Sequence, residues 1–293
     1  MKVLLFGKNG QLGWELHRTL ATLGDIIAVD YPEIDFTSVD CVREAVRRAA
    51  PQVIVNAAAY TAVDRAESES DAAMAVNAAA PGVIAEESAA FGAALIHFST
   101  DFVFDGKKGE PYSEDDTPNP LNMYGKSKRA GEEAVEQAGG AFLVIRTSYV
   151  YSLRRECFVT SVLKWAREQT TMRIAADQTG NPTWCRMLAG ATAQLLAAGG
   201  RNVVPWLHER KGIYHLAGDG HASRFDWAQE IVRCDPHREE QIVRRIESAS
   251  TAEFPTPAVR PLFSALNCSR FHDTFGFRLP DWRYALRLAM EGQ

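Results

Sequence analysis

The sequence predicts an α/β protein in which helices cover both faces of a parallel sheet. Short apolar segments alternate with longer, helix-like segments through the first 150 residues, and this alternation is typical of parallel strands joined by helices. A glycine-rich turn follows the first apolar segment at residues 7–13. Beyond about residue 150 the alternation weakens. We therefore expect a doubly wound sheet in residues 1–150, with further strands from about 170–176 and 212–216, and a smaller C-terminal α/β lobe in residues 151–293.

The bulk composition argues against nucleic acid and membranes as partners. Of the 293 residues, 46% are hydrophobic and 24% are charged, as in ordinary soluble domains. A net charge of -5 disfavours a surface for nucleic acid or anionic lipid. The cysteines are spread without a Cys-x-x-Cys pair, as reduced thiols of cytoplasmic proteins are. No apolar run approaches the ~18 residues of a spanning helix. We expect a cytoplasmic protein.

The first predicted strand, residues 2–6, leads directly into Gly7, Gly10 and Gly13, and a helical pattern of leucines follows. Glycines at this spacing allow a tight turn, a close approach of the backbone to a diphosphate, and close packing of the helix on the strand. The free amides at the start of the helix would then face the anion. This context indicates a Rossmann-type dinucleotide site rather than a glycine-rich turn without a ligand.

The second predicted strand, residues 26–29, ends at Asp30. An acid about 20 residues past the glycines can accept hydrogen bonds from the ribose hydroxyls of adenosine, and it would repel the 2′-phosphate of NADP. The alternative is a solvated loop acid. The sequence therefore favours NADH moderately and leaves both NADH and NADPH open as the cofactor.

Small residues dominate the segment after the third predicted strand, residues 53–55. Such residues at the end of a strand would let a flat ring lie against the backbone, so we interpret this segment as the floor of a cofactor site; the alternative is the start of an alanine-rich helix. The segment comprises Asn56, Ala57, Ala58, Ala59, Tyr60 and Thr61. The acidic run that follows, from Asp64 to Asp71, is interpreted as a solvated face rather than a metal site.

Two short motifs carry the candidate chemistry. An apolar run at residues 93–98 ends in Ser99 and Thr100, and Tyr124 and Lys128 open a later helical stretch. Residues four apart share a helix face, so Tyr124 is expected to face Lys128. A cation beside a phenol lowers a pKa that starts near ~10, which would make Tyr124 a proton donor at neutral pH. A hydroxyl of Thr100 or Ser99 could hold a carbonyl group.

The histidines and the remaining arginines give weaker signals of function. The histidines show no His-x-x-x-His ligand pair, so we interpret them as structural, including His97, which lies within the fourth predicted strand. The arginine pairs at 154–155 and 244–245 could meet a diphosphate, although paired arginines are usually solvated. Arg260, which lies between prolines 257 and 261, is a better candidate for substrate binding. No metal site is predicted.

Together these motifs resemble the extended short-chain dehydrogenase/reductase family. The likeness rests on residues 5–13, 56–67, 99–104 and 124–128, and it continues through residues 146–148, 177–183, 260–261 and 279–282. It implies reduction of the C4 ketone of a dTDP-linked 6-deoxysugar by NADPH or NADH. Tyr124 would donate the proton, Lys128 would hold the nicotinamide ribose and tune Tyr124, and Thr100 would steady the ketone.

The resemblance also implies which residues contact the two ligands. Residues 1–150 would bind NAD(P), and residues 151–293 would mainly bind the sugar nucleotide. Gly10, Gln11 and Leu12 would meet the diphosphate, Asp30 the adenosine ribose, Asp35 and Phe36 the adenine, and Ala59, Tyr60, Thr61 and Phe98 would line the cofactor. Thr100, Asp101 and Tyr149 would contact the sugar nucleotide.

Three departures from the family pattern affect these expectations. Members commonly carry tryptophan at Tyr149, and residues 152–158 lack the usual loop rich in glycine and asparagine. Arg186 occupies the place of an acid in members that dimerise through magnesium. Although Glu15 could bind a cation, Arg186 would oppose it, so we expect a monomer or a homodimer without a metal bridge.

Two other functions remain open at the level of sequence. One is a different nucleotide-sugar enzyme of the family, namely an epimerase, a dehydratase or another ketoreductase. The other is a non-catalytic NAD(P)-binding regulatory subunit. The intact set of Thr100, Tyr124 and Lys128 argues against a regulator, because a binding module would not need a tuned phenol.

Overall fold

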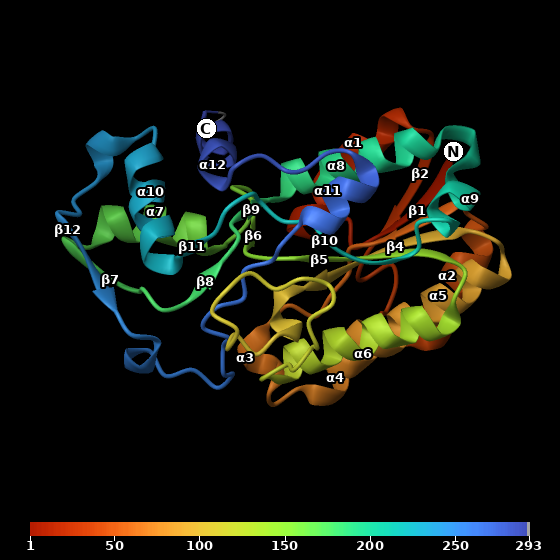
Figure 1. The fold of residues 1–293 in the computed structure, drawn as a ribbon, viewed down its shortest axis with the longest axis horizontal. Helices are drawn as coiled ribbons and strands as arrows, with labels where there is room; N and C mark the ends of the chain where they lie inside the picture. The colour runs from red at the N-terminus through yellow and green to blue at the C-terminus, as the bar shows by residue number, and fades with distance from the viewer. Residues whose placement is uncertain (292–293) are drawn as a thin grey trace.

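Six parallel strands form the central sheet of the computed structural model, which describes residues 1–291 (Figure 1). Their spatial order is β10-β5-β4-β3-β1-β2, and every neighbouring pair is parallel. The strands are β1 (Lys2–Phe6), β2 (Asp25–Val29), β3 (Val53–Asn56), β4 (Ala94–Thr100), β5 (Ala141–Thr147) and β10 (Gly212–His215). The predicted doubly wound sheet is confirmed.

Helices cover both faces of this sheet, above and below it in Figure 1. One layer contains α1 (Gln11–Thr19), α8 (Cys185–Gly199), α9 (Val203–His208) and α11 (Ser269–Phe275); the other contains α2 (Val39–Ala49), α5 (Ala80–Ala90) and α6 (Met123–Ala138), with the short α3 (Val63–Ala66) and α4 (Ser70–Met74). Side chains alternate between the two layers along each strand. In β1, Val3 and Leu5 belong to the first core, and Leu4 and Phe6 to the second. The inner strands β1, β3, β4 and β5 are buried on both faces, which explains why they are almost continuously apolar, while the edge strand β2 is only partly buried.

Two glycines fix the turn between β1 and α1. Gly7 has φ +88°, and a Cβ there would lie 2.6 Å from the backbone nitrogen of Ala58. A Cβ on Gly13 would lie 1.8 Å from the carbonyl oxygen of Gly7. Both positions therefore exclude a side chain, and α1 begins close against the end of β1.

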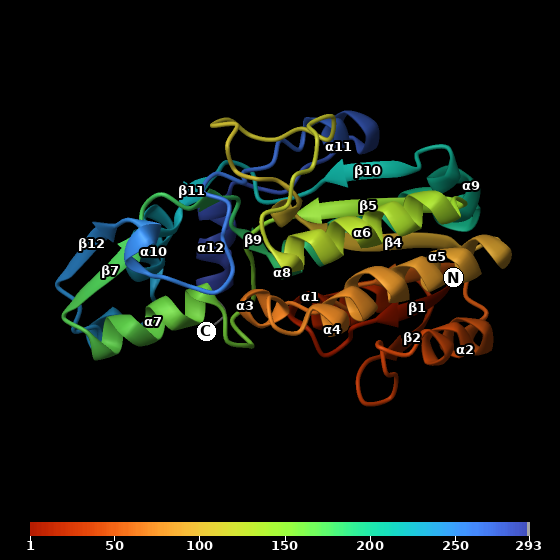
Figure 2. The same ribbon diagram turned by 90° about the horizontal axis from the view of Figure 1, so that it is seen from below.

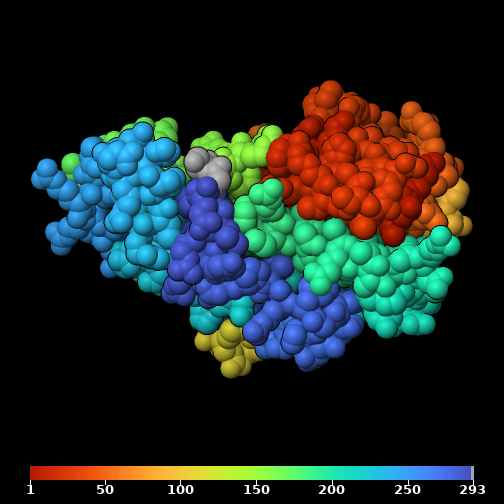
Figure 3. Space-filling model, turned by 90° about the horizontal axis from the view of Figure 1, so that it is seen from above, coloured from red at the N-terminus to blue at the C-terminus, as the bar shows by residue number. Residues whose placement is uncertain are grey.

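The C-terminal lobe lies at the other end of the molecule and contains three two-stranded sheets (Figures 1 and 2). They pair β6 (Val150–Tyr151) with β9 (Thr183–Trp184), β8 (Thr179–Gly180) with β11 (Ala222–Ser223), and β7 (Thr171–Ala175) with β12 (Arg245–Ala249). Helices α7 (Phe158–Glu168), α10 (Arg224–Cys234) and α12 (Trp282–Met290) bury Trp227 and Trp282 in a separate core. In the space-filling view, this lobe lies apart from the N-terminal residues at the opposite end (Figure 3).

One expectation about the sheet is wrong. Residues 170–176 do not extend the central sheet, because β7 pairs with β12 in the C-terminal lobe. The reason is visible in the burial of its side chains: Met172 and Ile174 are buried, whereas Thr171 and Arg173 are exposed. This alternation is typical of a strand with one exposed face, whereas the inner strands of the central sheet are buried on both faces. Strand β10, in contrast, pairs with β5 and adds to the central sheet.

No helix within residues 1–291 combines the length and the apolar character needed to cross a lipid bilayer.

Candidate active site

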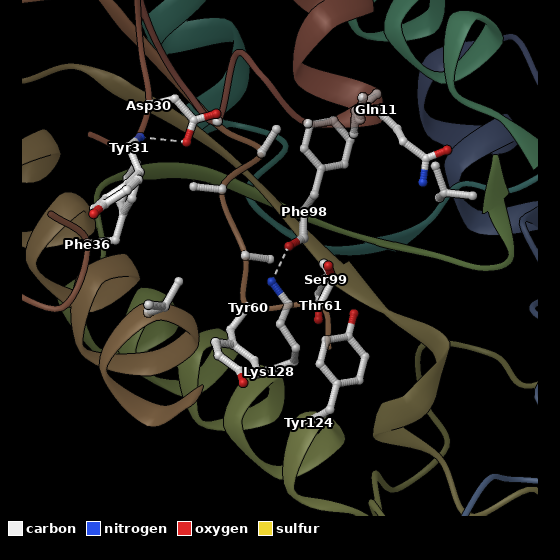
Figure 4. Close-up of a pocket in the computed structure, with 18 of the residues that line it drawn as sticks. Gln11, Asp30, Tyr31, Phe36, Tyr60, Thr61, Phe98, Ser99, Tyr124 and Lys128 are labelled. Atoms are coloured by element: carbon white, nitrogen blue, oxygen red, sulfur yellow. Dashed lines mark hydrogen bonds between the residues drawn. The ribbon is translucent and has the colours of Figure 1, made fainter. Parts of the chain in front are cut away.

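A cavity of about 820 Å³ opens at the carboxyl ends of the central strands (Figure 4). Parallel α/β sheets bind their ligands at this edge. Of the residues that the sequence predicts around the cofactor, all except Gly13 line this cavity: Gly7, Gly10, Gln11, Leu12, Asp30, Asp35, Phe36, Ala57, Ala58, Ala59, Tyr60, Thr61, Phe98, Tyr124 and Lys128. Gly13 lies behind the turn, against Gly7. Tyr31, Thr37, Val76, Ser99, Val150, Arg155 and Glu156 complete the lining.

The glycine turn offers the cavity hydrogen-bond donors and an acceptor. Gly10 caps α1 and has no side chain to bind the first amides of the helix, which therefore remain available to an anion. The Oε1 atom of Gln11 is buried and has no hydrogen-bond partner among the described residues. Asp30 borders the same turn, since its carboxylate accepts hydrogen bonds from the backbone N–H of Asn9 and of Tyr31, both at 2.8 Å. These features fit a dinucleotide.

The floor of the cavity is an extended loop, so the alternative of an alanine-rich helix at this point is wrong. Residues 57–62 have no helical structure. Asn77 holds the loop from below: its Oδ1 accepts from the backbone N–H of Tyr60 at 2.8 Å, and its Nδ2 donates to the Tyr60 carbonyl at 3.1 Å. The small side chains of Ala57, Ala58 and Ala59 thus face the cavity along a fixed backbone.

Tyr124 enters the cavity from the first turn of α6. The Asn122 side chain caps this helix by accepting from the backbone N–H of Gly125 at 2.8 Å. The Tyr124 ring packs edge-on against Phe102, with 5.8 Å between the ring centroids. Burial raises the pKa of the Tyr124 phenol to about 12, while a hydrogen bond with Thr100 lowers it and the Asp101 carboxylate raises it further. Tyr124 is therefore a protonated phenol at neutral pH.

Lys128 lies one helical turn later and points to β4 (Figure 4). Its Nζ donates to the carbonyl oxygen of Phe98 at 2.6 Å and lies 3.5 Å from Nε2 of His97. The side chain is 2% exposed. Burial lowers the pKa of Lys128 to about 8. The negative charge of Glu132 has the opposite, smaller effect and raises this pKa.

The predicted effect of Lys128 on the pKa of Tyr124 is wrong. We expected a lower pKa for the phenol, but the pKa is raised, because burial disfavours the charged phenolate and outweighs the effect of the hydrogen bond with Thr100. Spacing along the helix places the two residues on one face, yet Nζ of Lys128 turns to the Phe98 carbonyl instead of the phenol. Burial disfavours the charged phenolate because it removes the phenolate from water, and Tyr124 therefore keeps its proton.

Thr100 and Asp101 lie at the end of β4 and do not line the cavity directly. The Asp101 side chain is buried, and its Oδ2 accepts from the hydroxyls of Ser148 at 2.9 Å and Ser264 at 2.5 Å. Thr100 donates to the other oxygen of Asp101 at 3.2 Å. Burial raises the pKa of Asp101, and these hydroxyls lower it. Asp101 thus ties the end of β4 to the end of β5, through Ser148, and to the C-terminal half, through Ser264.

A second cavity, of about 400 Å³, lies in the C-terminal lobe. Aromatic rings and three arginines dominate its lining, which is formed by Phe158, Trp165, Arg173, Ile174, Ala175, Gln178, Arg224, Phe254 and Arg260. Tyr149 is absent from the lining of both cavities. Its ring instead lies beneath the Arg224 guanidinium, 3.8 Å from the ring centroid, and stacks on Trp227.

Arg260 joins this cavity to the cofactor half. Its Nη2 and Nη1 atoms donate to the two carboxylate oxygens of Asp64 at 2.7 and 3.1 Å. The pKa of Asp64 is lowered by this hydrogen bond with Arg260. The acidic run that begins at Asp64 is partly exposed, as expected, but it also fixes the site: Glu67 accepts from the backbone N–H of Met123, and Glu69 accepts from the Tyr60 hydroxyl. Asp64 and Glu67 have partners far away in the sequence, so no local sequence pattern could have predicted these contacts.

The two arginines at 154 and 155 make different contacts. Arg155 lines the cofactor cavity and donates from Nη1 to the carbonyl oxygen of Asn9 at 2.8 Å, so it crosses from the C-terminal half onto the glycine turn. Arg154 stacks on Trp14 of α1, with 3.6 Å between the guanidinium carbon and the ring centroid. Arg245, in contrast, belongs to β12 and pairs with Glu247 at 3.1 Å.

Glu15 of α1 and Arg186 of α8 lie together where the two helices meet, with Arg186 Nε 3.9 Å from the carboxylate of the buried Glu15. Burial raises the pKa of Glu15, and Arg186 lowers it. Within residues 1–291, the group of three potential metal ligands close enough to share an ion is His237, Glu239 and Glu240, all exposed in the C-terminal lobe.

Comparison with known proteins gives consistent matches over the full chain. A family model described as the RmlD substrate binding domain matches residues 1–292. A dTDP-4-dehydrorhamnose reductase from Burkholderia thailandensis is 43% identical, over 99% of this chain and 98% of that protein. The crystal structure of such a reductase from Clostridium acetobutylicum superposes with a TM-score of 0.90 at 31% identity, covering 99% of each chain. One from Bacillus anthracis in complex with NADP gives 0.89 at 32% identity, covering 100% of each.

Proposed function

This chain belongs to the RmlD substrate-binding-domain family, and from that premise we propose that it reduces the C4 ketone of dTDP-4-dehydro-β-L-rhamnose to give dTDP-L-rhamnose, with NADPH or NADH as the reductant. The observation that carries the proposal is the cavity at the strand ends. It places a protonated phenol, Tyr124, and a buried amine, Lys128, beside a glycine turn that fits a dinucleotide.

The cofactor would lie along this cavity with its diphosphate at the start of α1. Gly10, Gln11 and Leu12 offer backbone amides there, Asp30 would accept from the adenosine ribose, and Asp35 and Phe36 would border the adenine. When bound, the reduced nicotinamide supplies the hydride for C4. Lys128 would hold the nicotinamide ribose, close to the Ala57–Thr61 floor and Phe98.

Tyr124 would protonate the ketone oxygen as the hydride arrives. A pKa raised to about 12 keeps the phenol protonated throughout the neutral range, which is the form that a reductase needs. Thr100 would orient the phenol and the ketone, since its hydroxyl already contacts Tyr124 and Asp101. This division of roles requires no metal.

The dTDP part of the substrate would occupy the second cavity. Arg173, Arg224 and Arg260 can neutralise a diphosphate, and Phe158 and Trp165 can contact the thymine ring. Arg260 would exchange its bond to Asp64 for the diphosphate or hold both. Tyr149 supports this site through Arg224, and Asp101 would contact the sugar by way of its hydroxyl partners.

Arg155 is added to the cofactor contacts. Its guanidinium is anchored on the Asn9 carbonyl, next to the amides of the glycine turn where an anion would bind. A planar guanidinium pairs well with phosphate oxygens. We therefore propose that it contacts the cofactor diphosphate.

The composition and the α1–α8 contact bear on the cellular location and the assembly of the enzyme. A cytoplasmic location agrees with the scattered cysteines, which form no Cys-x-x-Cys pair, and the net charge of -5 disfavours nucleic acid as a partner. A monomer or a homodimer without a metal bridge agrees with the position of Arg186, whose positive charge lies beside Glu15 where a cation would have to bind.

The proposal is tested by following the absorbance of NADPH or NADH at 340 nm with dTDP-4-keto-6-deoxy-D-glucose and the 3,5-epimerase that acts on it. We expect oxidation that depends on the epimerase and yields dTDP-L-rhamnose. Oxidation without the epimerase would indicate a ketoreductase for another deoxysugar, and retained cofactor without net oxidation would indicate an epimerase. Cofactor binding without any turnover would favour the regulatory subunit.

A further inference from the structure

The buried side chains behind Lys128 form a chain of hydrogen bonds that the reaction described above does not use. Asn56 ends β3, His97 lies beside it in β4, and the two residues are direct partners in the parallel register. Asn56 is 2% exposed and His97 is 0% exposed. Asn56 Nδ2 lies 3.1 Å from His97 Nδ1, and His97 Nε2 lies 3.5 Å from Lys128 Nζ.

The backbone determines which way this chain runs. The N–H of Ala58 donates to Oδ1 of Asn56 at 3.1 Å, so the atom that Asn56 turns to the ring is its amide nitrogen. An amide nitrogen can only donate. His97 Nδ1 must therefore accept, and because the buried imidazole is neutral, its single proton is on Nε2.

The Nε2–H of His97 then faces Lys128. An ammonium has three donors and no acceptor, whereas a neutral amine can accept through its lone pair. The opposite neighbour of Nζ, the Phe98 carbonyl, can accept from either form. A donor fixed at this position consequently favours the neutral amine over the ammonium. Had the ring adopted the other tautomer, its lone pair would favour the ammonium.

We propose that Asn56 and His97 are positioning residues that set the protonation state of Lys128, and through it the pH range in which the enzyme works. This inference rests on the proposed reductase activity for its consequence, although the tautomer itself does not. The other ionisable groups facing this region are Glu132, whose carboxylate is held by Arg146 and Ser99, and Tyr124, which faces Asp101. They remain unchanged in the test below.

The sign of the expected pH effect follows from the role of Lys128. If the ammonium holds the ribose and stabilises the tyrosinate formed when Tyr124 gives up its proton, activity is present below the pKa of Lys128 and is lost as the pH rises through it. The basic limb of the pH profile should then lie near pH 8, where burial places this pKa.

The test is the substitution Asn56→Asp, alone and combined with His97→Phe. A carboxylate at position 56 accepts from the Ala58 N–H and also from His97 Nδ1–H, so it reverses the tautomer and turns the Nε2 lone pair to Lys128. We expect the basic limb of kcat to move up by about one pH unit in Asn56→Asp, as one charge-assisted hydrogen bond would cause. No such difference should separate His97→Phe from the double variant.

A shift that persists in the His97→Phe background would overturn the proposal, because the new carboxylate would then act on Lys128 directly. A basic limb unmoved by Asn56→Asp would overturn it as well. This comparison is a double-mutant cycle, and the melting temperature of each variant checks that it is folded.

A second measurement uses the wild-type protein, in case a buried aspartate prevents folding. The ¹⁵N chemical shifts of histidine-labelled protein distinguish the two tautomers, and the His97 signals are identified by their loss in His97→Gln. We expect Nε2–H without titration between pH 6 and 8, and an Nδ1–H tautomer would refute the inference. Because no substrate is present, this result is independent of whether the reductase assay succeeds.

Discussion

The cavity of the cofactor half and the cavity of the C-terminal lobe are built from different kinds of residue. Around the first cavity, much of the lining comes from short contiguous segments at the ends of strands of one sheet: the turn after β1, Asp30 after β2, the Ala57–Thr61 loop after β3 and Phe98 near the end of β4. Tyr124 and Lys128 are added by α6, and Arg155 by the C-terminal half. Around the second cavity, the lining comes from α7, β7, α10 and the segment near Phe254 and Arg260. No continuous motif describes it.

The two halves also differ in what holds them together. Backbone hydrogen bonds of a six-stranded parallel ladder align the strand ends of the cofactor half. The lobe has three two-stranded pairs, and side chains distant in sequence connect its loops, as when Asp177 accepts from the hydroxyl of Thr251 at 2.5 Å. A site supported by a ladder tolerates change in single side chains, whereas a site supported by side-chain contacts depends on each of them. Substitutions can test this contrast.

The largest effect on activity is expected from a substitution that removes the proton donor and leaves ligand binding intact. Tyr124→Phe should lower kcat by ~10²–10⁴ because general-acid catalysis is lost. The affinity for NADPH, measured by fluorescence titration, should change little. Tyr284→Phe, at a 49% exposed tyrosine of α12, is the control and should leave both values unchanged. Turnover close to wild type in Tyr124→Phe would remove the phenol from the mechanism.

In the lobe, Arg260→Ala should raise KM for the dTDP-sugar by about 10-fold to 100-fold, since a charge-assisted hydrogen bond contributes about 1.5–3 kcal/mol. The Kd for NADPH should stay unchanged, which separates the two halves. Asp64→Asn should give a smaller rise, because it loosens Arg260 without removing it. Arg278→Ala, an arginine 4.0 Å from Asp219, serves as the control. An equal loss of cofactor affinity would show that the two sites are not independent.

Arg155 belongs to the C-terminal half but contacts the glycine turn of the cofactor half. In contrast to Arg260, its removal should therefore weaken the binding of the cofactor. Arg155→Ala should weaken NADH and NADPH equally, by about tenfold, as expected for one exposed charge-assisted hydrogen bond of about 1.5 kcal/mol. Isothermal titration gives both constants. The neighbouring variant Arg154→Ala removes the same charge outside the cavity and should have little effect. A loss confined to NADPH would place Arg155 at the 2′-phosphate instead of the diphosphate.

The smallest effect is expected at Asp30. Asp30→Ala should raise the ratio of kcat/KM for NADPH to that for NADH by roughly fivefold, because removing a charge close to a 2′-phosphate relieves ~1 kcal/mol of repulsion in water. The ladder should hold the cavity otherwise intact. An unchanged ratio would mean that Asp30, which binds the N–H groups of Asn9 and Tyr31, serves only to fix the turn.

The sequence predicted most of the cofactor cavity because its signals are local. Glycine spacing, an acid at the end of β2 and small residues after β3 each follow a strand, and a parallel register brings strand ends to one edge. The same reasoning failed for residues 170–176, although the alternation of Thr171, Met172, Arg173 and Ile174 is a signal of a half-exposed strand that could have been recognised.

The sequence does not determine the directions in which the side chains of the active site point. Periodicity places Lys128 on the same helix face as Tyr124, but whether its amine turns to the phenol, to the Phe98 carbonyl or to His97 depends on ångström-scale packing between α6 and β4. The tautomer of His97 depends in turn on a backbone amide, that of Ala58, in the neighbouring strand's loop. Such choices are invisible to a pattern of residue types.

By itself, then, the sequence determined the doubly wound sheet, the edge at which the cofactor cavity opens, and the residues of the phenol–amine pair. The tertiary structure decided that Asp64 binds Arg260 across 196 residues, that Arg155 reaches the glycine turn, and that burial keeps Tyr124 protonated. The physical reason is the range of the forces involved. Strand and helix formation follows from periodic burial along the chain, whereas ion pairing and desolvation depend on which distant surfaces meet.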